Sequence, residues 1–269
     1  LNNVQLHGRF KLSNEFSGYE TYLDMGAGGL AGEKAENYFI LPQVYLSKAY
    51  SPGFKVHFGR RVMDWSSLDD YWMLGDLQPL FRWDAARPEI QGISGVTLQM
   101  KPTDLLQIDV FGSFLYIPSQ GPSFSVTDGK ITSGNPWFSP PVDIVSVSGQ
   151  PYNLLYSVKT PDISEIVFQP SLGAHMTFKS ADDAFMVRGG YFYKPRNELA
   201  LPVEGTISAV VGNENADIVV HPRVAHHTLS TLDLGYKGDK WGLIASGIYE
   251  SDVKYDVEDS WLFSPQFSD

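Results

Sequence analysis

Residues 166–194 read IVFQPSLGAHMTFKSADDAFMVRGGYFYK, and apolar residues recur at every second position on both sides of a short polar link. Before the link, Leu172 and Phe178 belong to the apolar set, and after it Val187 and Tyr191 continue the pattern. A period of two indicates β-strands, because successive side chains of a strand point to opposite faces. Two such runs joined by a few polar residues predict a β-hairpin.

The two runs are long for strands of a soluble protein. Taken from Ile166, the alternation predicts strands of about ten residues or more, whereas about five or six is usual. The apolar face ends in aromatic residues, with Phe178 at one end and Tyr191 and Tyr193 at the other. Long strands with one apolar face and aromatic ends are typical of tilted strands that cross a bilayer. We therefore predict an all-β protein, a transmembrane antiparallel up-and-down β-barrel.

The same alternation recurs along the chain and predicts about nine strands. The segments that show it are 4–12, 38–50, 54–61, 94–101, 106–116, 166–179, 185–194, one that ends at Tyr236, and 241–249. The pattern is blurred between Ser13 and Asn37, where the glycine-rich run 26–32 is interpreted as a loop. No linker or change in composition divides residues 1–269, so we expect a single domain.

The connections between these strands alternate in length. Short polar turns are expected at 51–53, 102–104, 180–183 and 237–240, and long connections at 63–91, 117–164 and 195–217. An outer-membrane barrel sorts its connections in this way, because its periplasmic turns are short and its extracellular loops are long. The alternative is a soluble β-sandwich or β-helix with unusually long strands.

The expected strand count is odd, whereas bacterial single-chain barrels have an even number of strands. The residues from Trp261 onward carry no alternation and resemble a loop, and a short strand near 253–257 is only weakly indicated. We therefore expect the chain to end within an extracellular loop and to form an incomplete part of a larger barrel.

Composition and motifs exclude several classes of protein. A net charge of −11 disfavours binding to nucleic acid, because nothing offsets the repulsion by phosphates. There is no cysteine, and no serine-hydrolase, phosphate-loop or zinc-protease motif is present. Adjacent His226 and His227 would point to opposite faces of a strand, which disfavours a shared metal. We expect no enzymatic activity, no cofactor and no metal.

Two segments resemble Gram-negative outer-membrane porin-type proteins. They are GRRVMDW at 59–65 and RWDAARPEIQG at 82–92, where a strand ending in Gly-Arg and a Trp leads into a loop rich in Asp, Arg and Pro. Arg61 stands where that family usually has Gln, and Ser66 where Gly is usual. The resemblance covers roughly residues 54–96. It implies a diffusion or export channel in the bacterial outer membrane, surrounded by outer-membrane lipid.

Charged residues on the predicted strands and in one long loop define candidate site residues. The expected pore-lining set is net basic and consists of Arg9, Lys11, Lys55, Arg61, Lys101, Asp109, Lys179 and Arg188. The expected constriction loop lies between the third and fourth strands and contains Asp64, Asp69, Asp70, Asp76, Arg82, Asp84 and Arg87. A basic wall facing an inward-folded acidic loop would create a transverse field at a constriction. The simpler alternative is that any aqueous lumen, and any surface loop, carries such charges.

Two functions are compatible with these features. The first is an outer-membrane channel that passes small hydrophilic or anionic solutes through a polar, net-basic lumen. The second is a barrel plugged by its loops that serves in adhesion, assembly or structure. Lumen width separates them, because about eight to ten strands leave a packed interior and about sixteen leave an aqueous channel. A second copy of the chain or another outer-membrane protein stays open as a partner.

Overall fold

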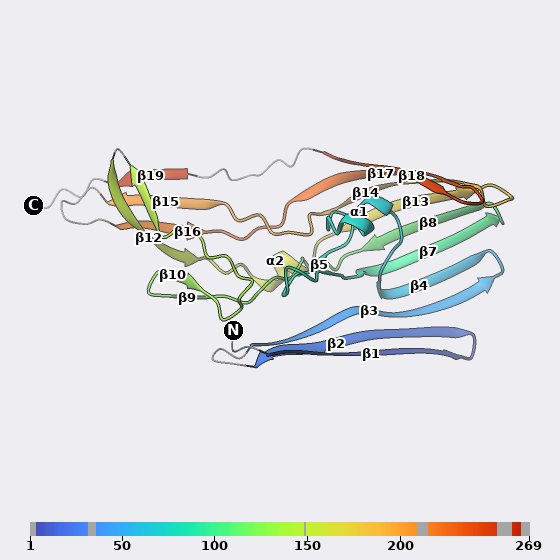
Figure 1. Cartoon of the computed structure of the whole chain (residues 1–269), viewed down its shortest axis with the longest axis horizontal. Helices are drawn as coiled ribbons and strands as arrows, with labels where there is room; N and C mark the ends of the chain where they lie inside the picture. Colours follow the sequence, from blue (N-terminus) through green and yellow to red (C-terminus); the bar gives the residue numbers. More distant parts are fainter. Residues whose placement is uncertain (1–3, 32–35, 148, 209–214, 252–259, 265–269) are drawn as a thin grey trace, which may run out of the picture.

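The computed structural model describes residues 4–31, 36–147, 149–208, 215–251 and 260–264. Its main feature is a ten-stranded sheet in which every strand is antiparallel to its neighbours (Figure 1). In order across the sheet, the strands are β1 (Val4–Phe16), β2 (Tyr19–Ala31), β3 (Glu36–Ser51), β4 (Phe54–Arg61), β7 (Ile93–Thr103), β8 (Leu106–Ser113), β13 (Ser171–Lys179), β14 (Phe185–Pro195), β17 (His226–Lys237) and β18 (Gly242–Glu250). Within the described residues, no helix is long and apolar enough to cross a membrane.

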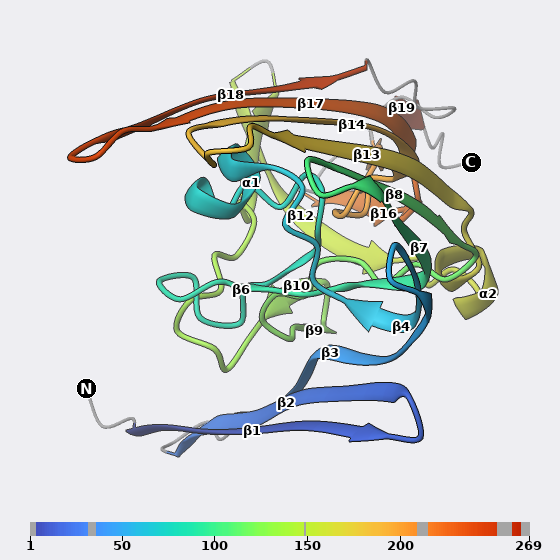
Figure 2. The same cartoon turned by 90° about the vertical axis from the view of Figure 1, so that its right-hand side faces the viewer.

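The sheet is curved and has two edges. Viewed from its short-turn end, it bends around the segment that contains α1 (Ser67–Trp72) (Figure 2). In the described part of the chain, β1 pairs only with β2, and β18 only with β17. The prediction of an all-β antiparallel fold is confirmed, and the sheet is not closed into a barrel by pairing between its edges.

The strand registers separate the side chains into two faces, which we name by their position. The inner face is the one on which the α1 segment lies, and the outer face is the opposite one. One row of paired residues on the outer face contains Leu46, Phe58, Val96, Gly112, Leu172 and Tyr193. The adjacent row on the inner face contains Ser47, His57, Thr97, Phe111, Gly173, Phe192 and Leu229. The predicted period of two is therefore present in the three-dimensional structure.

The interpretation of residues 26–32 as a loop was wrong, because β2 continues through this glycine-rich run to Ala31. The backbone there pairs with β1 on one side and with β3 on the other. A Cβ at Gly28 would lie 2.5 Å from the Tyr38 hydroxyl, so the neighbouring side chain occupies the space that a larger residue would need. This strand raises the count in the main sheet from the predicted nine to ten.

Two predicted strand boundaries also need correction. The run that starts at Ile166 is not one strand, because residues 163–167 form α2 (Ile163–Val167) and β13 begins at Ser171. β8 ends at Ser113, whose hydroxyl exchanges hydrogen bonds with the backbone of Leu115 and bends the chain away. An apolar alternation therefore continues past the point at which sheet pairing stops.

The long connections contain secondary structure of their own, which the sequence did not predict. A five-stranded sheet at the long-loop end has the order β11 (Ile144–Val147), β12 (Gln150–Val158), β16 (Asn215–Val220), β15 (Val203–Ser208) and β19 (Ser260–Ser264). Two short hairpins accompany it, β9 (Ser125–Thr127) with β10 (Lys130–Thr132) and β5 (Leu80–Phe81) with β6 (Glu89–Ile90). Residues 261–264, expected to be loop, belong to β19, which pairs in parallel with β15, and residues 265–269 lie outside the described part of the chain. The weakly indicated strand near 253–257 lies outside the described residues.

Candidate constriction site

The connection between β4 and β7, residues 62–92, is folded onto the inner face of the main sheet, and we call it the α1 loop. Its helix starts at Ser66, whose hydroxyl accepts a hydrogen bond from the Asp69 N–H (3.4 Å). It ends at Met73, which adopts a left-handed conformation (φ 50°). One turn of helix is marginal by itself. The position of the α1 loop is therefore set by its contacts with the wall.

An apolar contact holds the start of the loop against the wall. Met63, Trp65 and Leu77 are buried in a cluster with Phe111, Phe192 and Leu229 of the inner face. The Trp65 ring stacks on Phe192, with 4.9 Å between ring centroids. The aromatic residues of the loop fall into two groups. Trp65, Phe81 and Trp83 pack, whereas Tyr71 and Trp72 are more than 70% exposed.

An ionic contact fixes the loop to β14 and β17. The Arg188 guanidinium donates to Asp233 Oδ2 (2.6 Å), to Asp64 Oδ1 (2.7 Å) and to Ser67 Oγ (2.5 Å). The Ser67 N–H also donates to Asp233 Oδ2 (2.8 Å). Arg188 and Asp233 are buried, so these charged groups are stabilised by each other and by their hydrogen bonds instead of by water. Arg188, expected to line the pore, therefore anchors the α1 loop.

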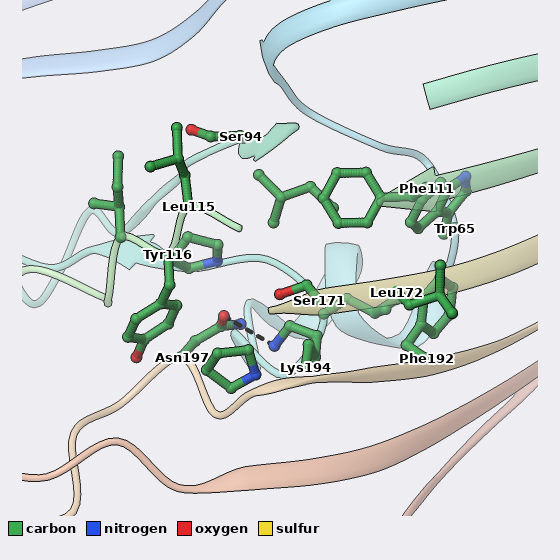
Figure 3. Close-up of a pocket in the computed structure, with 16 residues that line it drawn as sticks. Trp65, Ser94, Phe111, Leu115, Tyr116, Ser171, Leu172, Phe192, Lys194 and Asn197 are labelled. Carbon is green, nitrogen blue, oxygen red and sulfur yellow. Dashed lines mark hydrogen bonds between the residues drawn. The ribbon is translucent and has the colours of Figure 1, made fainter. Parts of the chain in front are cut away.

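A third contact involves Lys194 of β14, which is not among the predicted site residues. Its ammonium donates to the Asp76 carbonyl and to Asn197 Oδ1, both at 2.9 Å. Figure 3 shows Lys194 and Asn197 pointing toward each other beside a cavity of about 30 Å³, which Trp65 and Phe111 also line. A space of this size holds about one or two water molecules, so the cavity is a packing gap and not a solute path.

On the opposite side of the inner face, most basic side chains are paired with acids. Arg9 bonds Asp24 through two nitrogens (2.7 and 2.8 Å) and also contacts Glu89 (3.0 Å). Lys11 lies 3.5 Å from the same Asp24 carboxylate, and Lys55 lies 2.5 Å from Glu20. Asp24 and Glu20 fall in the segment where the predicted alternation was blurred, which is why the sequence analysis missed them. Tyr19, Thr21 and Leu23 point to the outer face, so Glu20 and Asp24, which alternate with them, point to the inner face.

The other expected pore-lining residues have different surroundings. Asp109 is buried and accepts a hydrogen bond from Gln107 (2.9 Å). Lys101 and Lys179 are exposed near the short turns, away from the α1 loop. The Arg61 guanidinium lies over the Tyr45 ring, 5.7 Å from its centroid.

The expected constriction residues are divided between the wall and the interior of the loop. Asp64 contacts the wall through Arg188, whereas buried Asp69 accepts a hydrogen bond from the Asp76 N–H within the loop (2.8 Å). Arg82 pairs with Glu198 of the connection after β14. Asp84 caps the turn at Ala86 (2.9 Å), and the side chain of Arg87 is exposed.

Asp70 is the loop residue with the most perturbed carboxyl group. Burial, together with the nearby carboxylates of Asp64 and Asp69, raises the pKa of Asp70 to about 7. Burial also raises the pKa of Asp76, with Asp69 as the next cause. The loop therefore concentrates negative charge, which Arg188, Lys194 and Arg196 partly offset.

The stability of the docked α1 loop should therefore fall as pH rises. Because the folded pKa of Asp70 is raised from 3.8 to about 7, the docked loop binds more protons than the unfolded chain between these values. Protonation of Asp70 therefore favours the docked loop fully below about pH 4, and this contribution is lost as the pH rises to about 7. Asp70→Asn should stabilise the loop at pH 8 by roughly 1 kcal/mol, a discounted value because solvent screens the partly exposed group.

Urea titrations followed by tryptophan fluorescence at pH 5 and pH 8 measure this difference. Asp104→Asn, which removes an exposed carboxylate from the β7–β8 turn, is the matched control. A pH dependence that is unchanged in Asp70→Asn would contradict the assignment.

The histidines do not assemble a reactive or metal-binding group. His226 stacks on Tyr193 of the outer face (5.2 Å), whereas His227 Nδ1 lies 2.6 Å from Glu250 Oε1 on the other face. His57 Nδ1 lies 2.6 Å from the Ser47 hydroxyl, but both side chains are buried in the wall. Across the parts of the chain that the structure describes, no group of three or more His, Cys, Asp or Glu side chains is arranged to hold a metal ion.

No family model matches this chain, and no curated protein matches it.

Proposed function

We propose that this chain forms part of the wall of an outer-membrane channel through which small hydrophilic solutes pass. The proposal is supported above all by the opposite polarity of the two faces of one long-stranded sheet. The outer face exposes large apolar side chains on strand after strand. They include Leu6, Phe10, Leu12, Leu46, Phe58, Val96, Leu98, Leu172, Met176, Val187, Leu232, Leu234 and Leu243. An apolar surface that extends over a whole sheet needs either a partner or lipid to cover it.

Aromatic residues at the short-turn end of the outer face favour lipid. Phe185, Tyr236 and Trp241 form a chain of ring contacts at 4.9 and 5.0 Å. On the same face, at β2 and β3, the Lys48 ammonium donates to the Tyr19 hydroxyl (3.0 Å) and lies above the Tyr19 ring. Aromatic rings beside a lysine that reaches toward the turns are typical of the boundary between hydrocarbon and water.

The inner face supports a conduit rather than a second lipid contact. It carries the charged pairs described above, and the α1 loop crosses it: near its start the loop is bonded to β14 and β17, and farther on Trp83 packs with Ile40 of β3 and Glu89 pairs with Arg9 of β1. Asp64 and Asp70 of the loop lie toward β14, whereas Arg61 of β4, which has no acidic partner among the described residues, lies against Tyr45 of β3; this separation of charge favours the transverse field expected at a constriction.

This proposal requires additional strands at the two edges of the sheet. Unpaired N–H and C=O groups in hydrocarbon cost several kcal/mol each, so strands beyond β1 and β18 must pair with them in a membrane. Every described residue of β1 is exposed, including apolar Leu6 and Phe10. We therefore expect the ten strands to belong to a larger closed wall.

The test is electrical conductance in a planar lipid bilayer. Purified full-length protein, folded in detergent, should produce stepwise conductance, and vesicles that contain it should swell in small sugars such as arabinose. Folded protein that inserts into the bilayer without conducting would overturn the channel and favour the second candidate. That candidate is a plugged barrel that displays the five-stranded sheet of its long loops for adhesion or assembly.

A further inference from the structure

We infer that Arg61 is the solute-contacting cation of this conduit, and that the solute group it binds is a carboxylate. The inference rests on the proposed channel function and adds to it a class of solute and the residue that selects it.

The other arginines and central lysines of the inner face have acidic or carbonyl partners. Arg9 is bound by Asp24 and Glu89, and Arg188 is bound by Asp233 and Asp64. The Lys55 ammonium is paired with Glu20, and the Lys194 ammonium with Asn197 and a carbonyl. A charge that is already neutralised attracts a passing anion only weakly. These side chains hold the wall together and do not select solutes.

Arg61 differs from this set. Among the residues that the structure describes, no carboxylate oxygen lies within 4.0 Å of its guanidinium and no hydrogen bond from it is formed. Its contact is with the face of Tyr45, at 5.7 Å, and Tyr45 stacks in turn on Tyr22 with 5.3 Å between ring centroids. A ring face stabilises the positive charge without accepting hydrogen bonds in the way a carboxylate does. The N–H donors of Arg61 therefore remain available.

The contact with Tyr45 also reduces the cost of binding. A guanidinium that is held against a ring has already lost much of its side-chain freedom, so less conformational entropy is lost when a ligand binds. Its donors form a planar fork that matches the two oxygens of a carboxylate. A single unpaired guanidinium suits one negative charge, which favours a monocarboxylate over a phosphate dianion.

The position of Arg61 places this group at the level of the loop. It is the last residue of β4, directly before the chain leaves the wall to form the α1 loop. Its half-buried side chain lies on the β3–β4 side, whereas Asp64 of the loop is held on the β14–β17 side by Arg188. A solute that passes beside the loop would meet Arg61 where the passage is bounded by both.

The experiment compares Arg61→Gln and Arg61→Lys with the wild type in planar bilayers. Reversal potentials are measured in a potassium chloride gradient, and block of the chloride current is titrated with gluconate and, separately, with glucose. The wild type should prefer anions and be blocked by gluconate and not by glucose. Arg61→Gln should lose most of the anion preference and weaken block about tenfold, as expected when a charge-assisted bidentate pair is lost. Arg61→Lys should keep the anion preference but lose much of the block.

Arg223→Gln is the matched control, because Arg223 is exposed in the connection after β16 and its loss changes the net charge equally. A wild type that conducts, with Arg61→Gln no different from Arg223→Gln, would overturn the role of Arg61 and leave the channel proposal intact. Absence of conductance in the wild type would instead overturn the channel proposal. Equal block by glucose and gluconate would show that the wall does not select carboxylates.

Discussion

Arginine placed at Val110 or Leu172 should prevent most of the protein from folding into lipid bilayers. Both side chains lie on the outer face, with Val110 paired to Ala174 and Leu172 paired to Gly112 in the central strands. If this face meets hydrocarbon, an arginine near the bilayer midplane costs about 2–4 kcal/mol. A cost of this size shifts a folding equilibrium roughly 30-fold to several hundred-fold.

The measurement is the fraction of urea-unfolded protein that folds into phospholipid vesicles, read from its gel mobility without heating. Ser13→Arg is the matched control, because Ser13 is exposed and pairs with Tyr22 on the inner face. That variant should fold as well as the wild type. Similar losses in all three variants, or none in any of them, would contradict the assignment of the outer face to lipid.

Removal of Arg188 should release the α1 loop and produce the largest effect of any inner-face substitution. Arg188→Ala leaves the fully buried Asp233 carboxylate without its guanidinium partner, and it also removes the contacts with Asp64 and Ser67. Breaking a buried ion pair by removing one partner costs about 3–5 kcal/mol. We expect the loop to become sensitive to protease, and the channel to show larger and noisier conductance steps.

Two further variants separate this effect from a general loss of stability. Arg82→Ala removes an ion pair whose two side chains are 38% and 65% exposed, so it should cost less than about 1 kcal/mol and leave the loop docked. Arg188→Leu combined with Asp233→Leu removes both buried charges and should regain much of the stability of the sheet, but not the docked loop. Protease resistance of the loop in Arg188→Ala equal to that of the wild type would show that the apolar contacts of Trp65 suffice.

The strand pattern of the main sheet could be predicted because it depends on local chemistry. The alternation in Leu172–Phe178 and in Val187–Tyr193 is set by which face of each strand is apolar, and a strand has only two faces. The registers place Arg188 and Phe192 on the inner face and Val187 and Tyr191 on the outer face, as the sequence indicates. The glycine-rich end of β2 could not be recognised in this way. Glycine fits there because side chains of the neighbouring strand occupy the space that a larger residue would need.

The candidate site was only partly predictable for the same reason. The sequence indicates that Arg9, Lys55, Arg61 and Arg188 share one face and that residues 63–91 form an acidic connection. It does not indicate that Arg188 is used to hold Ser67, about 120 residues away, or that Glu20 and Asp24 neutralise the basic residues beside them. Partner choice depends on which strands are neighbours and on where a long connection folds.

The sequence by itself determined that this protein is built from long antiparallel strands with one apolar face, because that information is carried by each residue and its near neighbours. The tertiary structure alone decided that the connections form a second sheet, that the start of the α1 loop is held against β14 and β17, and that Arg61 has no acidic partner among the residues that the structure describes. Those features depend on contacts between distant segments, whose energies come from burial and ion pairing that no short stretch of sequence encodes.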